Sequence, residues 1–222
     1  MATASATRER PHLRFHPSWL AIGLAIGGAA LFVISFFLPW WEFWLLAPQY
    51  PDGLQLLISL RGMSGDVHEI DLLNHYIGMK PLEAAAPTER HLAGYGIALL
   101  CVAIITIAVI GGRKLNRFVA VLAALLPIVF LADSFYWLYK FGHELDPRAP
   151  LHMHAFTPHL AGHGMIGQFE TYARPMVGFW IALVGVALVI ASAVIRPPQR
   201  QRSPSRQASL NRADRGNPQP DV

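Results

Sequence analysis

Histidine and methionine are the residues of this chain whose types and spacing could do chemistry. In LNHYIGMK (residues 73–80), His75 and Met79 are four positions apart and follow Asn74. Either Asp71 or Asn74 could cap the start of a helix, and residues four apart in a helix lie on one face. The spacing therefore predicts that His75 and Met79 present two ligands on the same side of a short helix.

A second concentration of the same residue types lies in HMHAFTPHLAGHGM, residues 152–165. Its candidate ligands are His152, Met153, His154, His159 and His163. The first three alternate as the side chains of a strand would, and the last two are four positions apart. This density of imidazole groups is higher than a loop ordinarily carries, so the stretch is a second candidate site.

The softness of these ligands indicates copper. Thioether sulfur is a poor ligand for zinc, magnesium or ferrous iron but suits Cu(I), and imidazole accepts either copper state. An alternative stays open, because methionine often fills apolar gaps and a surface histidine is more often hydrogen-bonded than metal-bound. Haem is less favoured, because axial histidines must face one another from helices and only His91 and His143 approach the ends of the apolar runs.

Four apolar runs must position these residues, at 19–40, 92–112, 118–139 and 176–195. Each approaches the roughly 20 residues that an α-helix needs to cross a bilayer, and almost no polar stripe interrupts them. With 53% hydrophobic and 14% charged residues, the chain is predicted to be a multi-pass membrane protein. The aromatic groups PWWEFW and FYWLY are predicted to lie in belts at the membrane interface.

The distribution of lysine and arginine predicts the orientation. Twelve of the 18 lie before the first run, between the second and third, or after the fourth, and the other six lie in the two long intervening segments. By the positive-inside rule, both termini are cytoplasmic and segments 41–91 and 140–175 are periplasmic loops of a bacterial inner membrane. The basic pI of about 9.5 then reflects attraction to the cytoplasmic leaflet, and no nucleic-acid partner is expected.

These assignments predict an all-α membrane fold of four transmembrane helices. Residues 1–18 form a basic cytoplasmic N-terminus, residues 19–196 the transmembrane domain with its loops, and residues 197–222 a disordered basic tail. Within the first loop, LQLLISL and GDVHEI are predicted to be the two strands of a hairpin. The two outer loops are expected to form a small mixed α/β cap.

Asp133 is the one carboxylate within an apolar run, and a charged group at that depth is a candidate functional residue. It lies near the outer end of the run, so it could equally reach water or pair with Lys140. No nucleophile with its base, phosphate-binding glycine loop or pair of catalytic carboxylates is recognisable. The single cysteine, Cys101, cannot support a dithiol mechanism. An independent enzyme is therefore not expected.

The phrases YPDGLQL, GDVHEIDLLNHYIGMKPL, ELDPRAP and FTPHLAG resemble a family of small, mostly uncharacterised bacterial membrane proteins whose outer loop carries Asn-His-Tyr-Ile-Gly-Met. The likeness runs over about residues 39–178. The family is associated with gene neighbourhoods for nitrous oxide reductase maturation and copper supply. The resemblance implies a copper-related accessory role for Asn74, His75 and Met79, whereas the histidines of residues 152–163 are less regular in the family.

The sequence thus predicts an integral membrane accessory protein that binds or delivers copper at its periplasmic face for a periplasmic redox enzyme. Its expected partners are the lipid bilayer and a periplasmic copper enzyme or chaperone. The alternative is a structural membrane subunit that anchors or scaffolds a redox complex without binding metal.

Because the cation count favours cytoplasmic termini by twelve to six, we expect a reporter that is active only in the periplasm to work when fused after Pro81 or Leu151. The same reporter should be inactive after Arg117 or at the C-terminus. The measurement is reporter activity normalised to the amount of fusion protein. Activity from the Arg117 fusion would contradict the placement of the histidines outside the cytoplasm.

Overall fold

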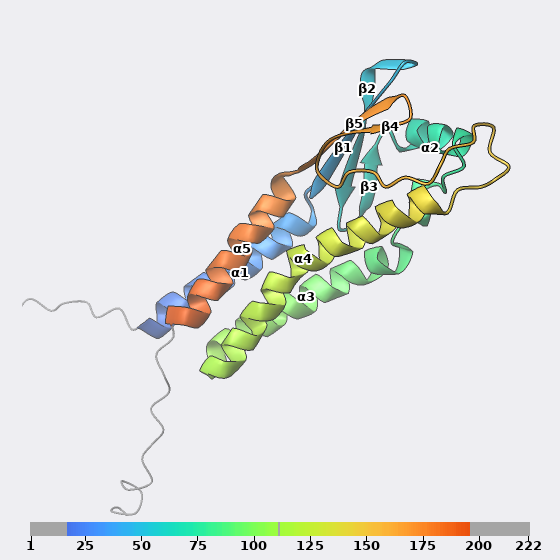
Figure 1. Cartoon of the computed structure of the whole chain (residues 1–222). Helices are drawn as coiled ribbons and strands as arrows, with labels where there is room; N and C mark the ends of the chain where they lie inside the picture. Colours follow the sequence, from blue (N-terminus) through green and yellow to red (C-terminus); the bar gives the residue numbers. More distant parts are fainter. Residues whose placement is uncertain (1–16, 111, 196–222) are drawn as a thin grey trace, which may run out of the picture.

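The computed structural model of the 222-residue chain describes residues 17–110 and 112–195. In chain order, the elements are α1 (Pro17–Phe36), β1 (Trp41–Ala47), β2 (Tyr50–Ser59), β3 (Gly62–Gly65), α2 (Val67–Tyr76), the 3₁₀ helix η1 (Leu82–Ala84), α3 (Pro87–Ile110), α4 (Arg113–His143), β4 (Gly162–Ile166), β5 (Phe169–Pro175) and α5 (Val177–Ile195). The strands and α2 form a cap at one end of the long helices (Figure 1). The predicted tail of residues 197–222 and most of the predicted N-terminus of residues 1–18 lie outside the described residues.

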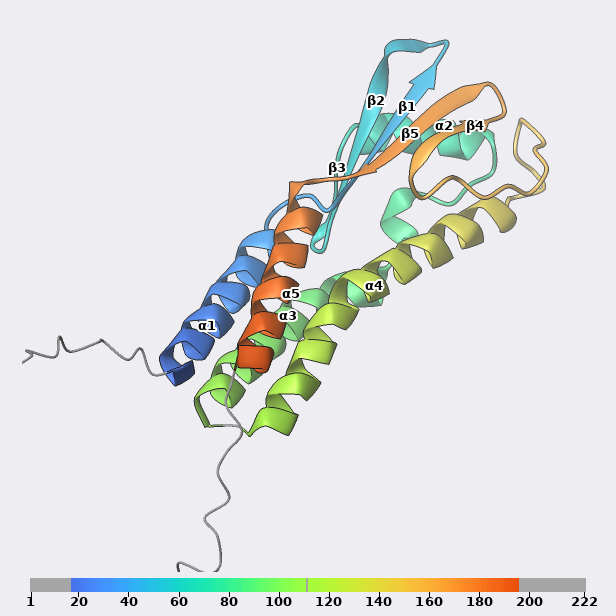
Figure 2. The same ribbon diagram turned by 60° about the vertical axis from the view of Figure 1, so that its left-hand side comes forward.

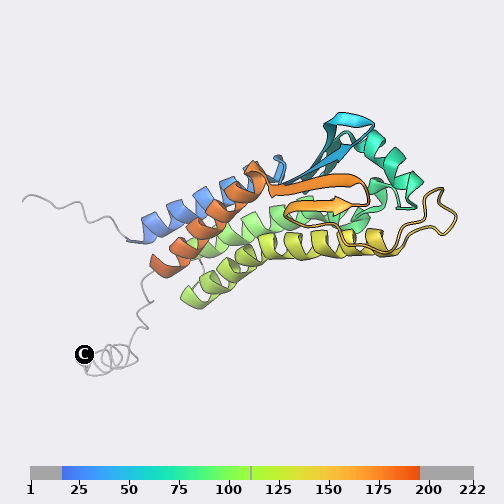
Figure 3. The same cartoon turned by 45° about the horizontal axis from the view of Figure 1, so that its top comes forward.

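Four helices, α1, α3, α4 and α5, are long and apolar enough to cross a membrane, which fits the predicted multi-pass protein. They overlap the four predicted runs, although α3 begins at Pro87 and α4 extends from Arg113 to His143. At a rise of 1.5 Å per residue, the 31-residue α4 is about 46 Å long, well beyond the ~30 Å of a hydrocarbon core. The helix therefore continues into the cap, where it runs beneath the sheet (Figure 3).

α1 and α5 form the most extensive helix contact, because small residues let their backbones approach closely. A Cβ on Gly28 would lie 3.0 Å from the carbonyl oxygen of Gly185 and 2.7 Å from a methyl of Val189. Across the same interface, the Ser192 hydroxyl donates to the carbonyl of Ala21 at 2.7 Å. Small residues and interhelical hydrogen bonds are the usual means of helix packing in lipid. The α3–α4 pair lies beside α1 and α5 and completes the bundle (Figure 2).

The prediction of an all-α fold is wrong, because the segments between the spanning helices form a five-stranded antiparallel sheet in the order β3-β2-β1-β5-β4. The central strand β1 follows α1 after four residues, and β5 leads almost directly into α5 (Figure 2). In the β1–β5 ladder, Glu42 pairs with Arg174, which is 132 positions later. Periodicity is a signal within a short window, so it cannot reveal a sheet assembled from two distant loops.

The predicted hairpin is confirmed for its first strand and wrong for its second. All of LQLLISL except Leu60 lies within β2, but its predicted partner is replaced by β3, GMSG. GDVHEI instead leads into α2, which begins at Val67. The predicted helix caps, Asp71 and Asn74, lie inside α2, which Asp66 precedes. The Oδ2 of Asp66 accepts a hydrogen bond from the backbone nitrogen of Gln55 at 2.7 Å, and its own backbone N–H donates to the Gln55 carbonyl at 2.8 Å. These bonds attach the start of α2 to β2.

Two adjacent tryptophans join the sheet to the helices. Trp40 is fully buried and Trp41 is 5% exposed, so neither is the lipid-facing belt residue predicted from PWWEFW. Their rings pack on Phe130 of α4 and Phe179 of α5, with centroid distances between 4.9 and 6.3 Å. The indole N–H of Trp41 also donates to the carbonyl of Leu160 at 2.7 Å, which fastens the segment before β4 to the same junction.

Backbone hydrogen bonds close this junction. The N–H of Trp40 donates to Ile58 at 2.8 Å, and the Trp40 carbonyl accepts from Met176 at 2.9 Å. The N–H of Gly178 donates to Pro39 at 2.9 Å, and a Cβ on Gly178 would lie only 2.6 Å from that carbonyl oxygen. The chain leaving α1 and the chain entering α5 are therefore in direct contact.

The face of the sheet away from α2 and α4, called the outer face below, holds a buried carboxylate. Glu42 of β1 is 3% exposed and accepts hydrogen bonds from the Nε of Arg174 and the Nε2 of Gln55. Burial alone would raise the pKa of Glu42, but these two hydrogen bonds and the charge of Arg174 outweigh it and hold the pKa below its usual value. The ionised Glu42 therefore links β1, β2 and β5.

We expect the cap to lose stability in acid through Glu42. Because the pKa of Glu42 is lower in the folded than in the unfolded chain, its stabilisation is complete above the unfolded-state pKa of about 4.3 and is lost as the pH falls through the folded-state value. Glu42→Gln should be less stable than the wild type at pH 7, by about 1 kcal/mol, and should lose less stability than the wild type on acidification.

The measurement is the thermal unfolding midpoint of the purified protein at a series of pH values, followed by tryptophan fluorescence. Glu170→Gln is the control, because it removes a half-exposed carboxylate from β5 on the same face. Equal responses of the wild type and Glu42→Gln to acid would contradict this role of Glu42.

Candidate ligand-binding cavity

A cavity of about 220 Å³ lies between the sheet and the cap ends of α3 and α4. Its upper wall is the inner face of the sheet, with Phe43, Leu56 and Ile58. α2 closes one side with Ile70 and Leu73, which pack against β2 in a small apolar core of the cap. The lower wall is the last third of α4 together with the first turns of α3, which lie beneath the sheet (Figure 3). Most of the lining is apolar.

The cavity crosses the expected boundary of the membrane. The α4 residues that line it run from Phe130 to Phe141, a rise of about 16 Å. Asp133 lies 20 residues after Arg113, the first residue of α4, which corresponds to about 30 Å, the thickness of a hydrocarbon core. The cavity therefore extends from the edge of the apolar layer into the cap.

Two buried nitrogen donors in the cavity wall make no hydrogen bond of normal geometry. Asn74 of α2 is 7% exposed, and its Nδ2 has no partner among the described residues. The Nε1 of Trp137 has the carboxylate of Asp133 close by, one turn before it on α4, although the geometry is not that of a normal hydrogen bond. An unpaired buried donor costs roughly 1–3 kcal/mol. An acceptor placed at either nitrogen would recover part of that free energy.

Three ionisable side chains line the cavity, and carboxylates outnumber the cation. They are Glu89, Arg90 and Asp133. The guanidinium of Arg90 is directed at the backbone, since its Nε donates to the carbonyl of Ala86 at 3.3 Å and its Nη2 to that of Glu83. The charge balance of the wall therefore disfavours an anionic ligand.

Asp133 does not form an ion pair with Lys140, which the sequence had suggested as one alternative. The ammonium group of Lys140 lies over the rings of Tyr136 and Trp137 instead, 5.7 and 4.9 Å from their centroids. Such cation–π contacts are favourable for a lysine whose surroundings are aromatic. Asp133 remains in the cavity wall, where its carboxyl group interacts with the indole N–H of Trp137.

The LNHYIGMK motif ends α2. Its last helical residue is Tyr76, Gly78 adopts a φ of +78°, and the N–H groups of Met79 and Gly78 donate to the carbonyls of Asn74 and His75 at 2.8 and 3.3 Å. This is a Schellman motif. The prediction that His75 and Met79 share a helical face is wrong, because Met79 lies beyond the left-handed glycine that ends the helix. His75 is exposed, whereas Asn74 and Met79 line the cavity.

The same glycine brings the end of α2 against the segment that follows α4. The carbonyl of Gly78 accepts from Asp146 at 2.8 Å, and that of Tyr76 accepts from Leu151 at 2.9 Å. A Cβ on Gly78 would lie 2.8 Å from the Asp146 carbonyl oxygen and 2.9 Å from the Cβ of Ala149. The motif therefore acts as a packing element of the cap and positions Asn74.

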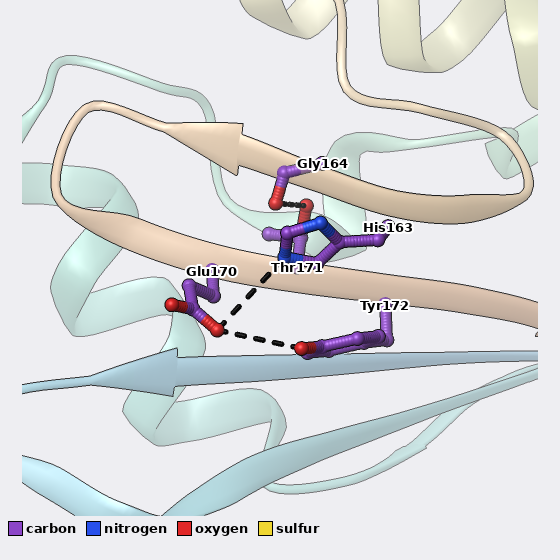
Figure 4. Close-up of polar contacts among 5 residues, drawn as sticks. All are labelled: His163, Gly164, Glu170, Thr171 and Tyr172. Carbon is purple, nitrogen blue, oxygen red and sulfur yellow. Dashed lines mark hydrogen bonds and ion pairs between the residues drawn. The ribbon is translucent and has the colours of Figure 1, made fainter.

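β4 places two of the candidate histidines on opposite sides of the sheet. His163 lies on the outer face, with its ring 4.7 Å from that of Tyr172 and its Nε2 3.9 Å from Glu170 Oε2 (Figure 4). His159 lies against the other face, since a Cβ on Gly164 would be 2.4 Å from its Nδ1. Neighbouring strand residues point to opposite faces, so the strand separates the two imidazoles.

The remaining candidates of this stretch do not join either histidine. His152 Nε2 bonds the carbonyl of Pro147 at 3.1 Å, His154 is exposed, and the methyl of Met153 lies against Gly167 in the β4–β5 turn. Within residues 17–110 and 112–195, no three His, Cys, Asp or Glu side chains are arranged so that they could hold a metal ion. Copper binding stays a prediction of the sequence.

Comparison of the chain with protein-family models gives no match, and comparison with curated proteins gives none either. The resemblance to a copper-associated membrane family therefore stays a prediction as well. The cavity has to be interpreted from its own chemistry.

The sequence singles out Asn74 and Asp133 as functional candidates, and both line the cavity. Trp137 is missed, because within FYWLY it has the pattern of an interfacial aromatic residue. Its importance comes from the sheet that lies over α4, which is a contact between distant parts of the chain. No local signal marks it.

We expect Gly78→Ala to destabilise the cap. A left-handed φ costs a residue with a Cβ about 1–2 kcal/mol, and the new methyl would also collide with Asp146 and Ala149. The measurement is the thermal unfolding midpoint in detergent. Gly96→Ala in α3 is the control and should be close to neutral, because nothing lies within 4 Å of its Cβ position. An unchanged midpoint for Gly78→Ala would contradict the packing role of the motif.

Proposed function

We propose that this protein is a multi-pass protein of a bacterial inner membrane that binds an apolar or amphipathic molecule from the bilayer in the cavity beneath a periplasmic cap. The charge distribution supports cytoplasmic termini, and with them a cap on the periplasmic side. The protein acts as a binding or accessory protein and not as an enzyme. The observation that carries this proposal is an apolar cavity at the expected membrane boundary with the buried, unpaired amide of Asn74 in its wall.

The position of the cavity favours a ligand that arrives through the bilayer. Ala93 of α3 and Phe130 of α4 line it, and both belong to helices long and apolar enough to span a membrane. Apolar molecules concentrate in that layer, since transfer of apolar surface out of water is favourable. Asn74, in contrast, belongs to α2 of the cap, so the cavity connects the two environments.

The volume limits what the cavity can enclose. An apolar protein cavity of about 150 Å³ can bind benzene, whereas pockets for drug-sized ligands are about 300–1,000 Å³. At about 220 Å³, this cavity has room for one or two rings or a short acyl segment. A larger amphiphile would insert one end and leave the rest in the bilayer.

The sequence led us to expect copper binding or, as the alternative, scaffolding without a metal. Neither of these functions places an apolar ligand in the cavity. Of the candidate copper ligands, Met79 alone lines the cavity, and the five histidines among them do not. A structural subunit that only anchors a complex would need no such cavity. Occupancy of the cavity therefore distinguishes ligand binding from scaffolding.

We expect Ala93→Trp to fill the cavity and exclude a small apolar molecule. The probe is trifluoromethyl-phenyl-diazirine, added to the protein in lipid nanodiscs and activated by light, and adducts on α2 are measured by peptide mass spectrometry. Labelling of α2 should fall several-fold, because Ile70 and Leu73 are reached through the cavity that the indole would occupy. Ala98→Trp is the matched control, since Ala98 is exposed on the same helix and should leave the labelling unchanged.

Saturable labelling of α2 in the wild type that Ala93→Trp removes would support the proposal. Labelling of α2 that is absent, or equal in the two tryptophan variants, would contradict it. Thermal unfolding of both variants checks that the cap is still folded.

A further inference from the structure

We infer that the ligand is a neutral amphiphile whose polar end is a carbonyl oxygen, held at the Nδ2 of Asn74 and the Nε1 of Trp137. Its apolar end points along α4 toward the bilayer. This inference rests on the proposed function and names the ligand class for the same cavity. Three features carry it, namely the unpaired amide of Asn74 with the indole N–H of Trp137 in the same cavity wall, the charges of the wall and the direction of the cavity.

The unpaired groups require an acceptor. Asn74 is more than nine-tenths buried, and its Nδ2 has no hydrogen-bond partner among the described residues. The Nε1 of the partly buried Trp137 has the carboxylate of Asp133 nearby but makes no hydrogen bond of normal geometry. A buried donor that finds no acceptor is unfavourable, whereas an apolar side chain of the same shape carries no such cost. A pure hydrocarbon would leave the Asn74 amide unpaired, and an oxygen acceptor would satisfy it.

The charges of the wall select a neutral acceptor. Glu89 and Asp133 line the cavity together with one cation, Arg90, whose guanidinium donates to the backbone carbonyls of Ala86 and Glu83. A carboxylate or phosphate in this low-dielectric space would be repelled by the two acids and would lose its hydration. A ketone or ester oxygen accepts hydrogen bonds without bringing a charge.

The direction of the cavity orients such a molecule. Asn74 lies at the cap end, on α2, whereas Phe130 and Ala93 lie at the membrane end. A carbonyl bound at Asn74 therefore places the attached apolar portion between the sheet and α4. The rest of a longer molecule can extend into the hydrocarbon layer without exposing apolar surface to water.

The test measures competition with the diazirine probe for labelling of α2 in nanodiscs. Methyl benzoate and sec-butylbenzene have similar size and shape, but only the ester carries a carbonyl; benzoate and benzylammonium are the anionic and cationic counterparts. After correction for partition into the bilayer, methyl benzoate should compete about threefold to tenfold better than the hydrocarbon, the range that one hydrogen bond supplies. It should also compete better than both charged compounds.

Asn74→Leu should abolish the advantage of the ester and leave competition by sec-butylbenzene unchanged. The hydrocarbon is thus an internal control for folding of the variant, since a collapsed cap would lose both compounds. Trp137→Phe removes the second donor while keeping an aromatic ring, and should reduce the same advantage. A preference for the ester that survives both substitutions would overturn the inference while leaving the proposed function intact.

Stronger competition by benzoate or benzylammonium than by the ester would also overturn the inference. If neither the ester nor the hydrocarbon competes, the proposed function itself fails. A further comparison separates two sources of the carbonyl. Duroquinone presents it on a ring and methyl benzoate presents it as an ester, so the better competitor identifies a quinone-like or a lipid-ester ligand.

Discussion

The structure depends on one junction, where the chain leaves α1 for the sheet and returns from the sheet to α5. Trp40 and Trp41 fill it, packed on an aromatic residue from each of α4 and α5. Two backbone hydrogen bonds complete it: the N–H of Trp40 donates to the carbonyl of Ile58, and the carbonyl of Trp40 accepts from the N–H of Met176. Buried aromatic rings and paired backbone groups occur together at this junction. They fix the orientation of the sheet relative to the helix bundle. Its inner face consequently lies over the end of α4 (Figure 3).

That direction creates the cavity. α4 is longer than a bilayer requires, and its extra turns provide a wall opposite Phe43 and Ile58 of the sheet. Protein interiors are usually close-packed, so an apolar space of about 220 Å³ with a buried, unpaired amide at Asn74 is the basis of the ligand binding that we propose. The C-terminal turn of α2 holds this amide in place. The turn packs against the segment after α4, and only a glycine at position 78 leaves room for that contact.

The histidines and methionines that are four positions apart in the sequence do not lie together in the fold. Four positions separate His75 from Met79, yet the helix ends between them and only Met79 reaches the cavity. Four positions also separate His159 from His163, yet β4 lies between their rings. Spacing predicts proximity only when the secondary structure is known. Here the helix expected for His75 and Met79 ends between them, and His159 and His163 lie on opposite sides of a strand.

The sequence by itself determined four helices long and apolar enough to cross a membrane, because runs of about 20 apolar residues match the thickness of a bilayer. It singled out Asp133 as a carboxylate within an apolar run, and Asn74 through its motif. Tertiary structure alone decided the burial of Trp40 and Trp41, the sheet that joins Glu42 to Arg174, and the place of Trp137 in the cavity wall. Hydropathy reports how residues partition between water and lipid, one window at a time. The pairing of β1 with β5 joins residues more than a hundred positions apart, and the position of the sheet over the end of α4 is likewise a contact between distant segments, so a local pattern encodes neither.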